Sequence, residues 1–252
     1  TDVALVDEKT GEFHQSKLAT TAPDRSQGVR DGIRRITADA GVNPNDITTL
    51  VHGTNLISDL LLKRQGARIG LVTTRGHRQV LHLSRSSIPG GLANWMQYNK
   101  SEPLAPLVAT IEAQERTGTG GEIVEPLDED RLVEELNYLA KQDIRALAVC
   151  LINSFANPDH ERQVARLAAQ VMPGIPVLLS SELQPQAQEY ERCLYTAASA
   201  YCLPAVNDYL DRVQEIIKSD LGNAKLRLLR TDGGVAAERS IRSRPLSLLR
   251  GG

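Results

Sequence analysis

The sequence predicts an α/β fold in which helices flank a mixed β-sheet, and three observations predict it. Strand-like and helix-like segments alternate in the second half of the chain, which is typical of α/β domains. Residues 146–152 are an apolar run without alternation, as expected of a parallel strand covered on both faces. Residues 51–76 place a His-Gly-Thr turn between a strand and a helix, and open α/β sheets bind ligands at such strand ends.

Composition limits the classes of function. The chain has 252 residues, 41% of them hydrophobic, which suffices for one large or two small domains. Its 29 basic and 31 acidic residues give a net charge of -2, so we expect small-molecule or protein partners rather than nucleic acid or a membrane. Three cysteines without C-x-x-C spacing indicate neither a disulfide framework nor a zinc site, and they favour a cytoplasmic setting.

The first half of the chain predicts a hairpin, a helix and a strand. Residues 3–7 and 12–19 form the hairpin. Asp24 is expected to cap the following helix, in which apolar residues recur at helical spacing: Val29, Ile33, Ile36 and Ala40. A strand at residues 47–52 then leads through the His-Gly-Thr turn into a helix over residues 55–64.

The second half predicts a regular alternation, with a helix at 128–142, a strand at 144–153, a helix at 158–171 and a strand at 176–180. A long helical region at 186–221 should be interrupted or bent at Pro204. A last strand occupies residues 225–230. Residues 84–106 fit no period and are expected to form a loop. Its aromatic pair, Trp95 and Tyr98, either lines a substrate pocket or docks a partner subunit, or the loop is only pinned in a surface groove by Trp95.

Five blocks in a fixed order carry a family resemblance: Thr1-Asp2 and residues 51–76, 153–161, 180–192 and 230–235. Together they are similar to the hydantoinase A and 5-oxoprolinase family, which includes subunits of ATP-dependent acetone and acetophenone carboxylases. The resemblance covers nearly the whole chain. It implies a ribonuclease-H-like lobe of the actin-like ATPases (sugar kinases, Hsp70 and actin), with ATP held between two lobes.

The resemblance also implies a domain organisation. Residues 1–182 would form the N-terminal α/β domain, and residues 183–252 the linking helices and the start of the second lobe. The chain begins without methionine and ends on a glycine pair. We therefore expect an incomplete protein that does not hydrolyse ATP alone.

The nucleotide-binding residues are implied by two glycine-rich matches. Thr1 and Asp2 match the end of a phosphate loop, with Asp2 near a Mg²⁺ or Mn²⁺ ion. Asp232, Gly233 and Gly234 match a turn that enters the second lobe. Loops of this kind present backbone N–H groups to phosphates.

The substrate side is implied by the His-Gly-Thr match. It makes His52 and Thr54 the expected catalytic residues, with Gly53 and Asn55 facing the substrate. An unperturbed histidine titrates near neutrality, so His52 could orient or deprotonate the attacking oxygen. The local alternative is that Gly53 only turns the chain, His52 is packed and Thr54 caps the next helix.

The resemblance implies an enzyme that uses ATP to phosphorylate a carbonyl or lactam oxygen. Residues 88–98, with their Pro-Gly-Gly-Leu and Trp95, favour an aryl-ketone carboxylase. A hydrolase of hydantoin or 5-oxoproline and a non-catalytic partner-binding domain are the alternatives. The implied partner is a hydantoinase B-type subunit.

The remaining ionisable residues are expected to be structural. His77 and His82 are five apart without a nearby carboxylate at ligand spacing, so neither is expected to bind a metal. His160 and Glu161 stand at a helix start, where capping explains them. Three residues at the start of the long helix are expected to pair at the surface: Glu189, Glu191 and Arg192.

Overall fold

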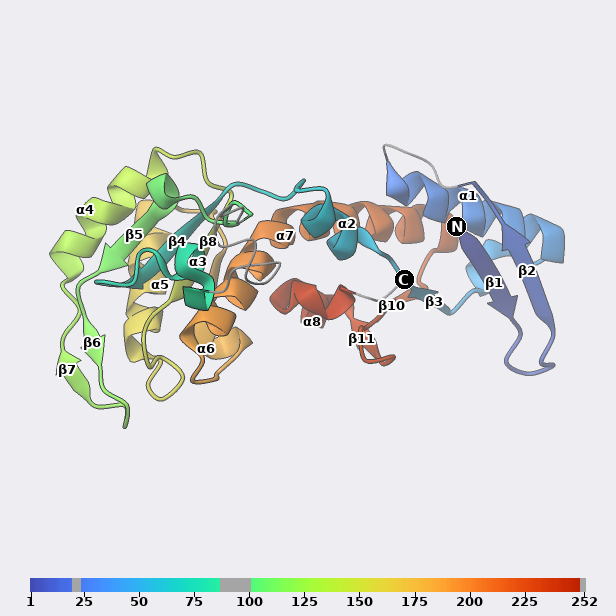
Figure 1. Ribbon diagram of the computed structural model, residues 1–252. Coiled ribbons are helices and arrows are strands. Elements are labelled where there is room, and N and C mark those ends of the chain that lie inside the picture. The colour runs from blue at the N-terminus through green and yellow to red at the C-terminus, as the bar shows by residue number, and fades with distance from the viewer. Residues whose placement is uncertain (20–23, 87–100, 250–252) are drawn as a thin grey trace, which may run out of the picture. The chain divides into compact units, whose positions relative to one another are not determined.

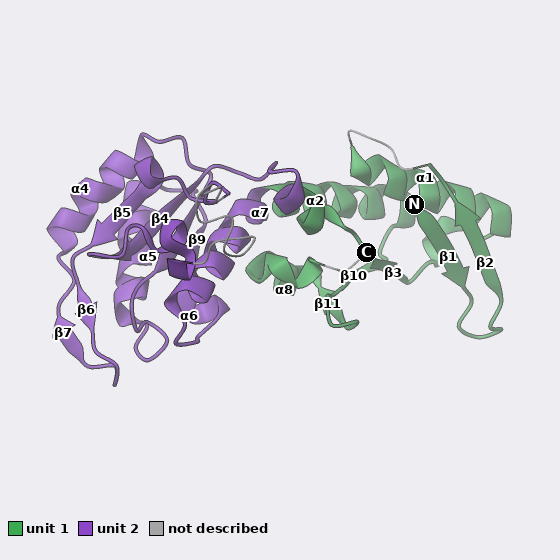
Figure 2. Ribbon diagram, viewed as in Figure 1, with its two compact units in different colours: residues 1–59, 205–252 green, residues 60–204 purple. Residues whose placement is uncertain are grey.

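The computed structural model describes residues 1–19, 24–86 and 101–249 (Figure 1). The chain divides into two compact units, unit 1 with Thr1–Asp59 and Ala205–Gly252 and unit 2 with Leu60–Pro204 (Figure 2). Unit 1 is therefore built from both ends of the chain, whereas the expected boundary at residue 182 falls inside unit 2. Over the described residues, no helix combines the length and the apolar character that crossing a membrane requires.

Unit 1 begins with the predicted hairpin of β1 (Asp2–Val6) and β2 (Phe13–Lys17), which pair antiparallel. The helix α1 (Arg25–Ala40) follows, and Asp24 caps it by accepting a hydrogen bond from the Ser26 N–H at 3.0 Å. The helix packs closely on the hairpin, since a Cβ on Gly32 would lie 2.6 Å from Cγ2 of Val3.

The second sheet of unit 1 has the order β11-β10-β3. The central strand β10 (Lys225–Leu229) runs parallel to β3 (Thr49–His52) and antiparallel to β11 (Val235–Ala237). The short elements of this unit are η1 (Pro44–Asp46), η5 (Ile217–Leu221), α8 (Glu238–Ser243) and η6 (Pro245–Leu248). Because β3 and β10 are parallel, their carboxyl ends meet at one edge of the sheet.

Unit 2 is built on a parallel sheet of order β5-β4-β8-β9. Its strands are β4 (Ile69–Thr74), β5 (Thr110–Ala113), β8 (Ala146–Cys150) and β9 (Val177–Leu179). All residues of β4 and β8 are buried, as the apolar run at 146–152 predicted. From the central strand β4 the chain moves outward to β5 at one edge of the sheet, and from the central strand β8 it moves outward to β9 at the other edge.

Two predicted helices pack on this sheet, α4 (Glu129–Ala140) and α5 (Asp159–Val171). The buried face of α4 carries Leu132, Leu136 and Leu139. The packing is tight, because a Cβ on Gly70 would lie 2.8 Å from Cδ2 of Leu139. The other elements of unit 2 are η2 (Ser84–Ser86), α3 (Val80–Leu83), η4 (Leu107–Ala109), β6 (Arg116–Thr117), β7 (Ile123–Glu125) and α6 (Ser180–Leu183).

Two helices cross the boundary between the units, α2 (Leu56–Leu62) and α7 (Glu189–Ile216). The helix α7 continues through Pro204, so an interruption there is wrong, whereas a bend at the proline stays a prediction. The α/β class is confirmed, but the strands form separate sheets rather than one mixed sheet. Trp95 and Tyr98 lie outside the described residues.

Candidate functional site

The His-Gly-Thr turn lies at the carboxyl end of β3, as predicted. Thr54 is buried, and its Oγ1 accepts a hydrogen bond from the N–H of Leu56, the first residue of α2. This bond satisfies one of the backbone N–H groups left free at a helix start. The local interpretation of Thr54 as a helix cap is therefore confirmed.

Tyr209 lies against the histidine of this turn. Nε2 of His52 is 2.7 Å from the hydroxyl oxygen of Tyr209, and the two ring centroids are 5.8 Å apart. Burial lowers the pKa of His52 to about 4 and raises the pKa of Tyr209 to about 12. Both side chains are thus neutral at pH 7. Since Nε2 is engaged with Tyr209, Nδ1 is the ring nitrogen left for another group.

Asn55, the residue after the His-Gly-Thr turn, is held in place by Arg25. The guanidinium of Arg25 donates to Oδ1 of Asn55 at 2.8 Å, and it also forms an ion pair with Asp59. The arginine comes from the first turn of α1, Asn55 directly precedes α2, and Asp59 lies within α2. An Arg25–Asp59 ion pair therefore lies next to the His-Gly-Thr turn.

The Asp232-Gly233-Gly234 turn is at the same edge of the sheet. His52 is level with Leu228 of β10 in the parallel pairing, and the turn follows β10 directly. Oδ1 of Asp232 accepts from the N–H of Gly234 at 3.1 Å, and Gly233 has a φ of 81°, which favours glycine. The structure therefore brings together two turns that are 180 residues apart, His52 to Asp232.

The N–H groups of this second turn are engaged inside the unit. Thr231 donates to the carbonyl oxygen of Ser247 at 2.7 Å, and Gly233 donates to that of Arg230 at 3.0 Å. Gly234 donates to Asp232. A phosphate could accept from these groups only if the turn opened, so nucleotide binding by Gly233 and Gly234 stays a prediction.

Thr1 and Asp2 lie in the separate hairpin sheet. The terminal nitrogen of Thr1 donates to the carbonyl oxygen of Leu18 at 2.9 Å, and Oδ1 of Asp2 lies 3.4 Å from Nζ of Lys17. In the described part of the chain, no three His, Cys, Asp or Glu side chains gather as a metal site would require. Mg²⁺ is often held by only one or two carboxylates together with phosphate and water, so a role for Asp2 fits this ion and stays a prediction.

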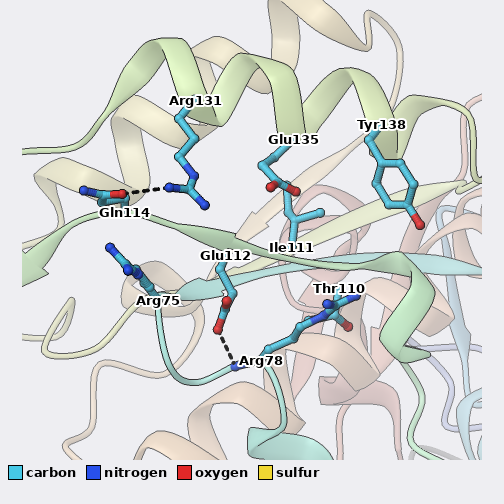
Figure 3. Close-up of a pocket in the computed structure, with 9 residues that line it drawn as sticks. All are labelled: Arg75, Arg78, Thr110, Ile111, Glu112, Gln114, Arg131, Glu135 and Tyr138. Carbon is cyan, nitrogen blue, oxygen red and sulfur yellow. Dashed lines mark hydrogen bonds between the residues drawn. The ribbon is translucent and has the colours of Figure 1, made fainter.

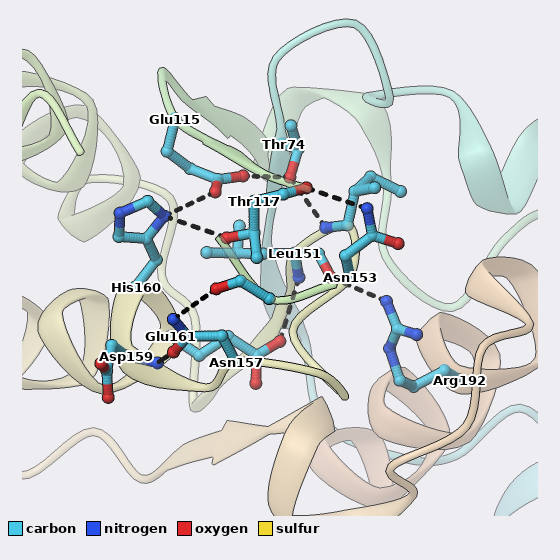
Figure 4. A network of polar contacts seen from close by, with 12 residues as sticks. Thr74, Glu115, Thr117, Leu151, Asn153, Asn157, Asp159, His160, Glu161 and Arg192 are labelled. Atoms are coloured by element: carbon cyan, nitrogen blue, oxygen red, sulfur yellow. Dashed lines mark hydrogen bonds and ion pairs between the residues drawn. The ribbon is translucent and has the colours of Figure 1, made fainter. Parts of the chain in front are cut away.

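Unit 2 contains a buried polar network that the sequence did not reveal (Figure 4). Nδ1 of His160 lies 2.7 Å from Oε2 of Glu115, and both side chains are almost fully buried. Thr74 donates to the same carboxylate and accepts from the N–H of Ile152 at 2.9 Å. His160 is at the predicted helix start, but the capping role is wrong, because Oδ1 of Asn157 accepts from the first N–H of α5.

The network continues into the start of α7. Glu161 accepts from the Leu151 N–H at 3.0 Å and from the Ser180 hydroxyl at 2.6 Å. Arg192 donates to Oγ of Ser180 at 3.1 Å and to the carbonyl oxygen of Leu151 at 2.7 Å. Only 1% of Arg192 is exposed, and its guanidinium donates to buried acceptors, so the predicted surface pairing of Arg192 is wrong. Glu191 does form a surface ion pair, with Arg85.

Two hollows are found on unit 2. A cavity of about 100 Å³ lies between β5 and α4, where Arg131 donates to Oε1 of Gln114 at 3.1 Å (Figure 3). A larger one, of about 410 Å³, lies beyond the carboxyl end of β4. The three cysteines are free and buried.

The chain is similar to one known family over most of its length. Residues 1–172 match the family model of the hydantoinase/oxoprolinase N-terminal region. The chain is 25% identical to caprolactamase subunit alpha of Pseudomonas jessenii, over 100% of this chain and 37% of that protein. It is 26% identical to the acetophenone carboxylase gamma subunit of Aromatoleum aromaticum, over 90% of this chain and 33% of that protein.

A solved structure has the same fold. The crystal structure of ATP-dependent caprolactamase from Pseudomonas jessenii superposes with a TM-score of 0.87 at 23% identity, and it covers 100% of this chain and 37% of that one. The chain thus spans about a third of the length of these relatives.

Proposed function

Because the chain belongs to the hydantoinase/oxoprolinase family, we propose that it is part of an enzyme that uses ATP to phosphorylate a carbonyl or lactam oxygen. The names of its relatives support this proposal, since they include a caprolactamase and an acetophenone carboxylase. A carbonyl or lactam is a poor electrophile, and phosphorylation of its oxygen turns that oxygen into a leaving group. ATP supplies the driving force.

The meeting of two turns at one sheet edge carries the proposal. The His52 turn ends β3 and the Asp232 turn ends β10, and these strands are parallel neighbours. Ligands bind beyond the carboxyl ends of strands in open α/β sheets. This edge therefore offers a histidine and a carboxylate to one ligand, whereas Thr54 caps α2.

The substrate-side chemistry follows from the state of His52. Its lowered pKa keeps the imidazole neutral at pH 7, so Nδ1 can form a hydrogen bond to the reacting oxygen without adding charge. With a pKa of about 4 the ring is a weak base, which favours an orienting role over proton abstraction. Catalysis of phosphoryl transfer consists largely of such positioning and of charge stabilisation.

ATP and Mg²⁺ or Mn²⁺ are part of the proposal. Asp2 would hold the metal, and Asp232 would contact the nucleotide. When bound, the nucleotide and metal supply the phosphoryl group and neutralise its charge.

Two reactions of the phosphorylated substrate are candidates, carboxylation of a ketone and hydrolysis of a cyclic amide. Sequence reasoning favoured ketone carboxylation, but it did so on residues 88–98, which lie outside the described residues. The similarity to caprolactamase subunit alpha covers all of the chain, and this favours hydrolysis of a cyclic amide as the second candidate. The third candidate is a non-catalytic domain that only binds partners. If it is right, calorimetry should detect no nucleotide binding to the full-length protein.

A partner subunit is also proposed. The relatives named above are an alpha and a gamma subunit, so they act within assemblies of several subunits. A hydantoinase B-type subunit is the partner that we expect for this chain.

Release of phosphate from ATP tests the proposed function. The full-length protein, alone and with its partner subunit, would be given a cyclic amide, a ketone with bicarbonate, or neither. We expect phosphate release that depends on one of the two substrates. Release at the same rate in all three mixtures would contradict coupling of ATP to a carbonyl substrate.

A further inference from the structure

Asn55 carries an exposed amide just beyond the carboxyl end of β3. It directly precedes α2, and its carbonyl oxygen accepts from the N–H of Asp59 at 3.0 Å, so its backbone begins the helix. The strand β3 pairs in parallel with β10, and open α/β sheets bind ligands beyond such strand ends. Asn55 therefore stands at a position where a side chain can meet a ligand.

A guanidinium fixes the orientation of the Asn55 amide. Nη1 of Arg25 donates to Oδ1 of Asn55 at 2.8 Å. A guanidinium has donors only, so the amide atom that meets it must be the oxygen; a reversed amide would set donor against donor. Nδ2 then carries two hydrogens for which the described residues supply no partner. The side chain of Asn55 is thus a donor toward any ligand.

The same guanidinium is itself held by Asp59. Arg25 and Asp59 form an ion pair in which the side chains are only 30% and 23% exposed. The planar fork of an arginine can meet a carboxylate and an amide oxygen at once, whereas the single ammonium of a lysine has no such fork. Because the two charges offset each other, the donor of Asn55 has no net charge beside it from this pair.

His52 supplies a second neutral donor on the same turn. Its Nε2 is engaged with Tyr209 and its lowered pKa keeps the ring neutral at pH 7, so Nδ1 can carry the one ring proton. A carbonyl oxygen has two lone pairs and can accept from two donors. A carboxylate or a phosphate gains more from charged donors. The turn therefore favours an uncharged oxygen acceptor.

We propose that Asn55 donates a hydrogen bond to the carbonyl oxygen of the substrate, beside His52, and that Arg25 is the positioning residue that orients the Asn55 amide. Asn55 then recognises the one group that a ketone and a cyclic amide share, so it does not distinguish between them. That ATP phosphorylates this oxygen rests on the proposed function, whereas the orientation of the amide does not.

Binding of two carbonyl probes without nucleotide tests the role of Asn55. The probes are acetophenone and δ-valerolactam, and ligand-observed NMR measures their binding to the full-length protein with its partner subunit. Asn55→Ala removes the donor and should weaken the binding of both probes by roughly fivefold. Asn55→Asp keeps the shape but sets an acceptor against the carbonyl oxygen, so we expect a loss of at least roughly tenfold. Asn137→Asp, the same substitution at an exposed site of α4, should change neither.

Variants of Arg25 test its positioning role. Arg25→Ala should weaken both probes about as much as Asn55→Ala does. Arg25→Lys keeps the charge and one donor site, so it should restore part of the lost binding. A purely structural role would lower thermal stability and leave the affinity of the folded variants unchanged. Circular dichroism of each variant confirms that it is folded.

Three results would overturn the proposal: no binding of either probe at millimolar concentration, binding to Asn55→Asp as tight as to the wild type, or binding that Arg25→Ala leaves unchanged. The assay contains no ATP, so its failure leaves the proposed function standing. Conversely, weakened probe binding in Asn55→Asp without any substrate-dependent phosphate release in the wild type would contradict the proposed function and leave the role of Asn55 intact.

Discussion

Nε2 of His52 lies 2.7 Å from the hydroxyl oxygen of Tyr209, and burial keeps both side chains neutral at pH 7. The contact joins the end of β3 to α7, so it fixes the histidine ring from a distant part of the chain. It also leaves Nδ1 as the nitrogen that can meet a ligand.

Replacing Tyr209 with Phe should therefore loosen His52. We expect a loss of about 1 kcal/mol in the free energy of unfolding, because one hydrogen bond to a partly buried ring is removed. Turnover should also fall. Urea unfolding measures the first effect, and Tyr138→Phe is the matched control, because the Tyr138 hydroxyl bonds Val108 at an exposed site. Equal losses in both variants would contradict the special role of Tyr209.

The stability of the protein should depend on pH through His52. Its pKa is lowered from 6.5 to about 4 in the folded state, so the unfolded chain binds a proton first as the pH falls. Stability is therefore complete above pH 6.5 and decreases toward pH 4, by at most about 1.4 kcal/mol per pH unit. In urea unfolding at several pH values, His52→Gln should reduce this slope relative to the wild type. An unchanged slope in the variant would refute the burial of a neutral His52.

Thr54 should act through its hydroxyl. Thr54→Ala removes the acceptor for the Leu56 N–H and should destabilise the protein by about 1 kcal/mol, whereas Thr54→Ser should retain most of the stability. Thermal unfolding of the two variants measures the difference. If serine fails to restore stability, packing of the methyl group rather than capping explains the position.

Removing one partner of the Glu115–His160 pair should be strongly destabilising. Removing one partner leaves the other buried without its contact, so Glu115→Ala should cost about 3–5 kcal/mol. Glu134→Ala, on the solvent side of α4, is the control and should cost less than about 0.5 kcal/mol. A loss as small as that of the control would mean that the network adds little to unit 2.

Local patterns in the sequence predicted most of the elements. The hairpin, the cap at Asp24 and the buried strand β8 follow from short-range rules, because turn residues, capping side chains and apolar runs act on their own neighbours. The position of the His-Gly-Thr turn followed from the same rules. That the His-Gly-Thr turn and the Asp232 turn lie at the same sheet edge did not follow from these rules, since it depends on the pairing of β3 with β10.

The contacts that sequence reasoning missed are long-range. Tyr209 is 157 positions from His52, and Glu115 is 45 positions from His160, so no period or spacing joins them. Arg192 looked like a surface residue because its neighbours are charged, but its acceptors are Leu151, directly after β8, and Ser180 of α6.

The central claim is tested most directly by measuring phosphate release from ATP. The assay uses the full-length protein with its partner subunit and compares the wild type with His52→Ala. The account predicts substrate-dependent release in the wild type and a fall of at least about 10²-fold in the variant, provided that the variant is folded. Unchanged substrate-dependent release in His52→Ala would contradict the placement of the reacting oxygen at the His-Gly-Thr turn.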